Sequence, residues 1–163
     1  LNYQHPAIVL HPPINPGDYQ TGVNPHKSEY ITLINLNRNK GSEIFYEVAK
    51  RMPERKFLAV RGSYDEQIIS DLPNVTTLPN SPDILLAYNQ TRLLLMPSKI
   101  ESYGLTAREA MSSGIPVICS DLPGLRENCG DAGIYLHRED IGGWIAERKK
   151  LDAKKSYLSR HAS

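Results

Sequence analysis

The chain has little of several features that identify common protein classes. Its 163 residues include only two cysteines, which excludes a disulfide-rich secreted scaffold. Lysine and arginine number 19 against 18 aspartate and glutamate, and this balance argues against a broadly nucleic-acid-binding surface. No apolar run approaches the roughly 18 residues that a membrane-spanning helix needs. We therefore expect one domain of ordinary size, with no nucleic acid as its partner.

Short functional signatures are also missing. No G-x-G-x-x-G follows a predicted strand, which argues against a dehydrogenase, and Lys40 is not part of a P-loop sequence. The five histidines and two cysteines have no metal-ligand spacing, so we expect no metal site. The chain starts at Leu1 with neither an initiator methionine nor a signal peptide. We expect a piece of a longer, cytoplasmic protein.

What the sequence does contain is an alternation of predicted strands and helices. Apolar runs between polar turns predict strands at residues 30–35, 57–60, 75–78, 93–96, 117–119 and 134–136. Apolar stripes predict helices at 43–52, 64–70, 83–88, 106–113 and from 141 onward, with Ser42 capping the first. This order predicts an α/β fold, a parallel sheet with helices on both faces. The carboxyl ends of its strands then share one edge, where ligands bind in such folds.

The first 27 residues lack the alternation of predicted strands and helices. Residues 8–10 could form a short strand, whereas residues 11–17 contain three prolines, which exclude a helix there. We predict an interdomain linker over residues 1–27 and a folded domain over residues 28–163.

The most informative segment is residues 97–111, which follows a buried strand and opens a helix. Gly104 allows close approach of the backbone, and the free N–H groups of residues 104–106 at the helix start favour an anion such as phosphate. Glu101 and Glu109 flank this point, and a carboxylate can accept two hydrogen bonds from vicinal hydroxyls. The combination fits a nucleotide sugar, which has two polyol parts bridged by phosphate.

Each of these residues also has a purely structural interpretation. Thr106 and Glu109 match a capping box, which would make Glu109 part of the helix start alone. Lys40 precedes Gly41 and Ser42 at the start of another helix, where a cation is disfavoured unless an anion binds beside it. An ordinary surface lysine explains Lys40 equally well, so the residues alone leave both alternatives open.

Together, residues 98–111 and 114–121 resemble the donor-binding half of GT-B glycosyltransferases. The closest resemblance is to the large retaining group called family 4, whose E-x7-E motif is filled by Glu101 and Glu109. The resemblance runs from about residue 30 to about residue 136. It implies a Rossmann-like parallel sheet flanked by helices, the C-terminal half of a GT-B fold. It also implies transfer of a sugar from a nucleoside-diphosphate sugar to an acceptor, with retention and without a metal or other cofactor.

The resemblance implies roles for the matching positions. Glu101 and Lys40 would be the catalytic pair, with Glu101 on the donor sugar and Lys40 on the leaving diphosphate, while Glu109 would hold the ribose. The base would lie against Leu78 and Pro79. The full set of implied donor-binding residues is Asn35, Arg38, Lys40, Gly41, Leu78, Pro79, Glu101, Ser102, Tyr103, Gly104, Leu105, Thr106 and Glu109.

The sequence departs from the family pattern in two ways. Asn35 stands five residues before Lys40, where the family usually has an arginine, and asparagine carries no charge. Either Arg38 replaces that arginine or the diphosphate is bound with one cation fewer. No acceptor-binding N-terminal domain is present, so we expect the fragment to bind donor but scarcely to catalyse.

Other functions remain open at this point. A GT-B epimerase acting on nucleotide sugars and a non-catalytic nucleotide-sugar-binding module share the same architecture. The basic tail over residues 147–160 is either a solvated helix face or a weak attraction to an anionic membrane surface.

Overall fold

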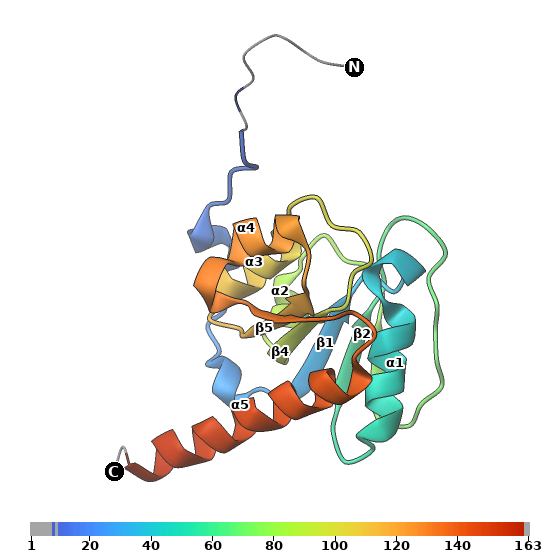
Figure 1. Ribbon diagram of the computed structural model, residues 1–163, viewed down its shortest axis with the longest axis vertical. Coiled ribbons are helices and arrows are strands. Elements are labelled where there is room, and N and C mark those ends of the chain that lie inside the picture. The colour runs from blue at the N-terminus through green and yellow to red at the C-terminus, as the bar shows by residue number, and fades with distance from the viewer. Residues whose placement is uncertain (1–7, 9, 162–163) are drawn as a thin grey trace.

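The fold is a six-stranded sheet covered by helices (Figure 1). The computed structural model describes residue 8 and residues 10–161, with the side chains of the last helix described as far as residue 151. The strands are β1 (Tyr30–Ile34), β2 (Phe57–Val60), β3 (Val75–Leu78), β4 (Thr91–Met96), β5 (Val117–Ser120) and β6 (Ile134–Leu136). Their order is β3-β2-β1-β4-β5-β6 and every neighbouring pair is parallel. The predicted α/β, Rossmann-like class is confirmed.

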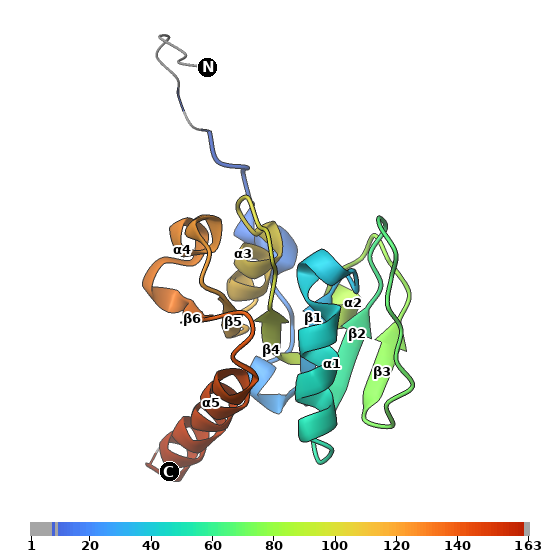
Figure 2. The ribbon, with the colours of Figure 1, turned by 45° about the vertical axis from the view of Figure 1, so that its right-hand side comes forward.

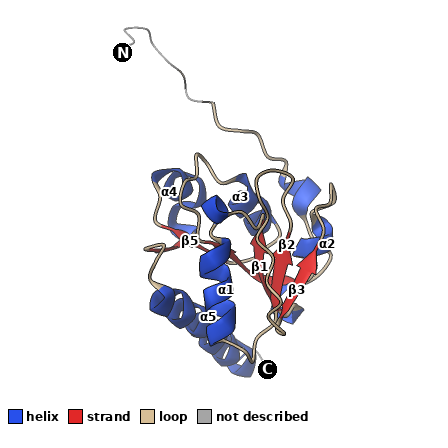
Figure 3. Cartoon of the chain, turned by 90° about the vertical axis from the view of Figure 1, so that its right-hand side faces the viewer, coloured by secondary structure: helices blue, strands red, loops and turns tan. Residues whose placement is uncertain are grey.

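Helices cover both faces of this sheet, as Figures 2 and 3 show. One face carries α1 (Ser42–Arg51) and α5 (Ile141–His161), and the other carries α2 (Leu85–Tyr88), α3 (Leu105–Ser112) and α4 (Pro123–Cys129). The described residues also form short 3-10 helices: η1 (Pro16–Tyr19) and η2 (Pro25–Lys27) precede β1, η3 (Arg38–Lys40) lies between β1 and α1, and η4 (Gly130–Ala132) lies between α4 and β6.

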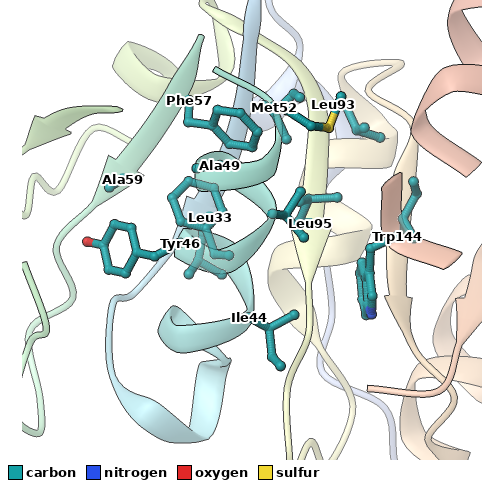
Figure 4. Close-up of a cluster of buried hydrophobic side chains, with 14 of the residues drawn as sticks. Leu33, Ile44, Tyr46, Ala49, Met52, Phe57, Ala59, Leu93, Leu95 and Trp144 are labelled. Carbon is teal, nitrogen blue, oxygen red and sulfur yellow. The ribbon is translucent and has the colours of Figure 1, made fainter. Parts of the chain in front are cut away.

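The strands read as continuous apolar runs because both faces of the sheet are buried. Alternate residues of β2 illustrate this: Phe57 and Ala59 pack under α1, whereas Leu58 and Val60 pack on the opposite side with Ala87 of α2. Figure 4 shows the side chains between α1 and the sheet. Burial of each large apolar side chain contributes roughly 1.5–3 kcal/mol. This packing fixes the strand ends from which the loops of the site emerge.

Three local predictions were wrong. Residues 64–70 form no helix, because Asp65 has a left-handed backbone with φ of 60° and Gln67 uses its side chain to bond neighbouring loops. No helix was predicted between residues 113 and 141, but α4 follows β5 and starts with Pro123, at a position where a proline is compatible with a helix. Ser42 lies inside α1, whose N-cap is Gly41.

The amino-terminal segment contains short ordered turns rather than only extended chain. Tyr19 of η1 packs against the cluster beneath α3, and Ser113 donates a hydrogen bond to its carbonyl oxygen. Ile8 and Leu10 are outside any strand, and Val9, between them, lies outside the described residues. The division into a linker and a domain stays a prediction.

The last helix is only partly as expected. Trp144 is fully buried and donates its indole N–H to the carbonyl of Arg138 at 3.0 Å. Arg148 is also buried, 3% exposed, so it does not belong to a solvated basic face. The side chains of the later basic residues of this helix, Lys154, Lys155 and Arg160, lie outside the described part. Within that part, no helix combines the length and apolar character that crossing a bilayer requires.

Candidate functional site

A cavity of about 450 Å³ opens at the carboxyl ends of β1, β2 and β3. Its lining residues are Ile34, Asn35, Lys40, Val60, Arg61, Gly62, Ser63, Tyr64, Leu78, Pro79, Asn80, Ser81, Asp83, Ile84, Leu86, Ala87, Gln90 and Thr106. These residues come from the loops at the ends of three strands, from α2 and the residues beside it, and from the first turn of α3. The cavity therefore lies at the edge of the sheet that parallel topology assigns to ligands.

The cavity has an apolar part and a polar part. Apolar side chains from strand ends and from α2, such as Val60, Leu78 and Leu86, suit a flat organic ring. Lys40 and Arg61 are the two cationic residues of the lining. Asp83 is its carboxylate, and it accepts a hydrogen bond from the backbone N–H of Leu85 at 3.0 Å at the start of α2.

An ion pair joins the loop after β1 to the loop after β4. The Nζ of Lys40 lies 2.6 Å from Oε2 of Glu101, a residue 61 positions later. Both side chains are largely buried, 22% and 10% exposed. The two strands are neighbours where the strand order reverses, which is the switch point at which α/β sheets form binding crevices. The structure thus brings together the two residues that the resemblance implies as the catalytic pair.

The same two loops touch through their backbones. Gly41 has a φ of 86°, and a Cβ at this position would collide with the carbonyl oxygen of Pro97. The N–H of Lys99 donates to the carbonyl of Asn39 at 2.7 Å. Only glycine fits at residue 41, because both its φ and its contact exclude a side chain. The two loops are therefore held close to one another at residues 39–41 and 97–99.

Arg138, in the loop before α5, forms hydrogen bonds with both the loop after β1 and the loop after β4. Its Nε donates to the carbonyl of Pro97 at 3.0 Å and its Nη2 to the carbonyl of Arg38 at 3.3 Å. The same Nη2 lies 2.8 Å from Oε1 of Glu43 in α1. Burial works against ionisation of Glu43, but the hydrogen bond from Arg138, a backbone hydrogen bond and the charges of Arg138 and Arg38 together outweigh it and lower the pKa of the Glu43 carboxyl.

Helix α3 begins beside the ion pair without a capping box. Its N-cap is Gly104, with a φ of 80°, so Thr106 lies within the helix and the capping-box interpretation of Glu109 is wrong. Leu105 and Thr106 instead present first-turn N–H groups that have no acceptor within the helix. The space beside the Gly104 Cα is occupied by Leu125 of α4, which explains the glycine by packing.

Glu109 receives its hydrogen bond from a buried tyrosine. The hydroxyl of Tyr88, which is 1% exposed, donates to Oε2 of Glu109 at 2.9 Å. Burial raises the pKa of Tyr88, and the neighbouring Glu109 carboxylate raises it further, so the hydroxyl stays a donor. The Glu109 carboxylate is thereby oriented beside the first turn of α3.

Not every residue implied by the resemblance lies in the cavity. Asn35, Lys40, Leu78, Pro79 and Thr106 line it, and Glu101 reaches it through Lys40. Elsewhere lie Arg38, Gly41, Ser102, Tyr103, Gly104, Leu105 and Glu109.

Arg38 and Tyr103 have surroundings of their own. Arg38 lines a separate hollow with Asp65 and Glu66. The ring of Tyr103 stacks on His11, with centroids 5.0 Å apart.

Sequence reasoning missed the residues that follow β2. Arg61, Gly62, Ser63 and Tyr64 line the cavity. Their position directly after a predicted buried strand, at the same sheet edge as the other loops, could have identified them as lining residues. Asp83 and the α2 side chains Leu86 and Ala87 were also missed as lining residues. Over the described residues, no three His, Cys, Asp or Glu side chains gather as a metal-binding group.

Comparison with known proteins assigns this arrangement to a family. Residues 29–151 match the family described as Glycosyl transferases group 1. The chain belongs to that family. The glycosyltransferase domain is 27% identical, over an alignment of 167 residues, to a D-inositol 3-phosphate glycosyltransferase of Mycobacterium sp. (strain JLS). It is 41% identical over 59 residues to O-antigen chain mannosyltransferase B of Escherichia coli.

The glycosyltransferase domain covers only part of each of these proteins. The first alignment spans 88% of this chain and 37% of the mycobacterial protein, and the second spans 36% and 16%. Among solved structures, Anabaena HepE in complex with UDP-glucose superposes with a TM-score of 0.73 and 17% identity, covering 88% of this chain and 47% of that one. At this identity the likeness supports the GT-B glycosyltransferase fold.

Proposed function

We propose that the chain is the donor-binding domain of a retaining glycosyltransferase, which transfers a sugar from a nucleoside-diphosphate sugar to an acceptor. The observation that carries this proposal is the contact of Lys40 with Glu101, 61 residues later in the chain, beside a cavity that Lys40 lines and that has an apolar and a polar part. Family membership and the UDP-glucose bound to Anabaena HepE support the same donor class.

Lys40 would stabilise the leaving diphosphate. Glycosyl transfer builds negative charge on this group as the sugar becomes oxocarbenium-like, so fixed positive potential beside it lowers the barrier. An ammonium has three N–H donors, so Lys40 can keep its bond to Glu101 and still donate to a phosphate oxygen. The N–H groups of Leu105 and Thr106 at the start of α3 would add to this potential. No step of the proposal requires a metal ion.

The carboxylates would hold the hydroxyl groups of the donor. Glu101 has one oxygen bonded to Lys40 and a second oxygen with which to accept from the transferred sugar. Glu109, oriented by Tyr88, would accept from the ribose. The base would pack between Leu78, Pro79 and the side chains of α2. The acceptor would be bound by a further domain, which this chain does not contribute.

Titration calorimetry of UDP, GDP and ADP, with the matching nucleosides, tests the proposal on the chain itself. At least one diphosphate should bind at or below millimolar concentration. Lys40→Gln should weaken that diphosphate about ten-fold or more and the nucleoside less than two-fold, because only the diphosphate meets the charge. Glu109→Ala should weaken both. Failure of all three diphosphates to bind would remove the proposal, and equal losses for Lys40→Gln would remove its assigned role.

The reaction requires the longer protein. Incubation of the intact enzyme with its donor and acceptor, followed by NMR of the anomeric centre, should show a transferred sugar with unchanged configuration. An isomerised donor would identify an epimerase instead, and no product despite donor binding would identify a non-catalytic module. Addition of EDTA should leave the rate unchanged.

Contact with a membrane surface is a separate part of the proposal. Lys149 and Lys150 of α5 are exposed, as weak attraction to anionic lipid headgroups requires. Sedimentation with vesicles rich in anionic lipid should show binding that falls as salt rises. Recovery of all the protein in the supernatant at low salt would refute this part without affecting the donor site.

A further inference from the structure

The two cationic residues of the cavity differ in their partners. Lys40 is bound to Glu101 at 2.6 Å, and this pairing neutralises much of its charge before any ligand arrives. Arg61 is exposed at the cavity rim. Across residues 10–151, no carboxylate or hydrogen-bond acceptor holds its guanidinium. Arg61 is therefore the cation of this cavity with its full complement of donors still available.

Neither of the residues first considered for a second positive charge can supply it in the cavity. Asn35 is buried and neutral, and its Oδ1 accepts a hydrogen bond from Nε2 of Gln67 at 2.9 Å. Arg38 faces a different hollow, where two carboxylates, Asp65 and Glu66, are its neighbours. A second cation for a diphosphate in this cavity would therefore come from another strand end.

The backbone of Arg61 is held by neighbouring segments, whereas its side chain extends into the exposed part of the cavity. The N–H of Arg61 donates to the carbonyl of Leu78 at 3.0 Å, which continues the β2–β3 ladder by one residue. The next N–H, of Gly62, donates to Oε1 of Gln67 at 2.6 Å. A Cβ at Gly62 would collide with the side chain of Asn35, so the loop lies directly on the end of β1. The asparagine thus helps to position the arginine loop.

We propose that Arg61 is the second phosphate-binding cation of the donor site, an assignment that rests on the function proposed above. A guanidinium presents a planar fork of N–H donors that matches two phosphate oxygens, and its hydrogen bonds to an anion are stronger than those between neutral groups. Lys40 approaches the cavity from the loop after β1 and Arg61 from the loop after β2. A diphosphate between them would meet both cations beside the first turn of α3.

The assignment predicts a dependence on ligand charge. Arg61→Gln should weaken the best-binding diphosphate among UDP, GDP and ADP by about ten-fold, the matching monophosphate by less, and the nucleoside by less than two-fold. Arg61→Lys should recover part of the loss, because the charge returns without the fork. Arg51→Gln is the matched control, since this exposed arginine lies on α1 and pairs with Glu47. It should change none of the affinities.

Calorimetric titration of the wild-type chain and these variants separates the possible failures. If the wild type binds no diphosphate, the proposed function fails with the assignment. If the wild type prefers the diphosphate to the nucleoside and Arg61→Gln keeps that preference, the assignment alone is wrong. A loss confined to Arg38→Gln, or an equal loss of nucleoside and diphosphate in Arg61→Gln, also overturns it. Melting temperatures within about 2 °C of the wild type confirm that each variant is folded.

Discussion

Replacement of Arg138 by methionine tests how the two loops of the site are held. Methionine keeps the apolar stem of the side chain but removes the bonds to the carbonyls of Pro97 and Arg38 and to Glu43. Each bond from a charged donor to a part-buried carbonyl is worth about 1 kcal/mol net, because water can replace some of it. The pair with Glu43 adds little, since that carboxylate is 42% exposed and solvent screens it. We expect a loss of about 2 kcal/mol.

Urea denaturation followed by circular dichroism measures this loss directly. For a domain of this size, about 2 kcal/mol lowers the melting temperature by roughly 4–8 °C. Arg126→Met is the matched control, because it breaks an exposed pair with Asp121 in which the side chains are 56% and 47% exposed. The control should lose less than about 1 kcal/mol. Equal losses in the two variants, or less than about 0.5 kcal/mol for Arg138→Met, would refute the view that Arg138 fastens the site loops.

The same variant has a predictable pH dependence. The pKa of Glu43 is lowered in the folded chain, so its contribution is present above its unfolded pKa of about 4.3 and is lost as pH falls through the folded value. Arg138→Met loses the part of that contribution that comes from Arg138 and keeps the part that comes from the backbone hydrogen bond of Glu43 and from the charge of Arg38. The stability difference between wild type and variant should therefore narrow below about pH 4. A difference that stays constant from pH 7 to pH 3 would show that Glu43 has no share in it.

Two further substitutions address the backbone contact and the buried tyrosine. Gly41→Ala should lower the free energy of unfolding by about 2–4 kcal/mol, because a Cβ meets both a left-handed φ and the opposite loop. Gly22→Ala, where no atom lies within 4 Å of the added Cβ, should leave it nearly unchanged, and similar urea midpoints for the two would contradict the contact. Tyr88→Phe should cost about 1–2 kcal/mol and weaken nucleoside binding several-fold, because Glu109 loses its buried donor. An unaltered nucleoside affinity in Tyr88→Phe would contradict the proposal that Glu109 binds the ribose.

The sequence predicted the fold best where the residues of one short segment determine its structure. The apolar runs at β1, β2 and β4 predicted buried strands, and parallel topology then predicted that Lys40 and Glu101 would share an edge. The helix expected at residues 64–70 failed because Gln67 bonds to loops distant in sequence.

Arg138 and Arg61 were not predicted as site residues for a related reason. Arg138 reaches the site from a position 100 residues after Arg38, and no spacing rule links the two residues. Arg61 follows a strand as predicted, but its importance depends on which neighbouring cations are already paired. Only the three-dimensional arrangement of partners supplies that information.

The order of strands has a consequence for folding. β1 and β4 are hydrogen-bonded neighbours, although all of α1, β2, β3 and α2 lie between them in the chain. Pairing such distant segments requires closure of a long loop, whose entropy cost precedes any gain from contact. The contact between Lys40 and Glu101 therefore cannot form in a chain that has folded only one half of its sheet. A diphosphate that contacts both Lys40 and the start of α3, as proposed above, would bind only the complete domain, and its free concentration would set how far it shifts the unfolding equilibrium.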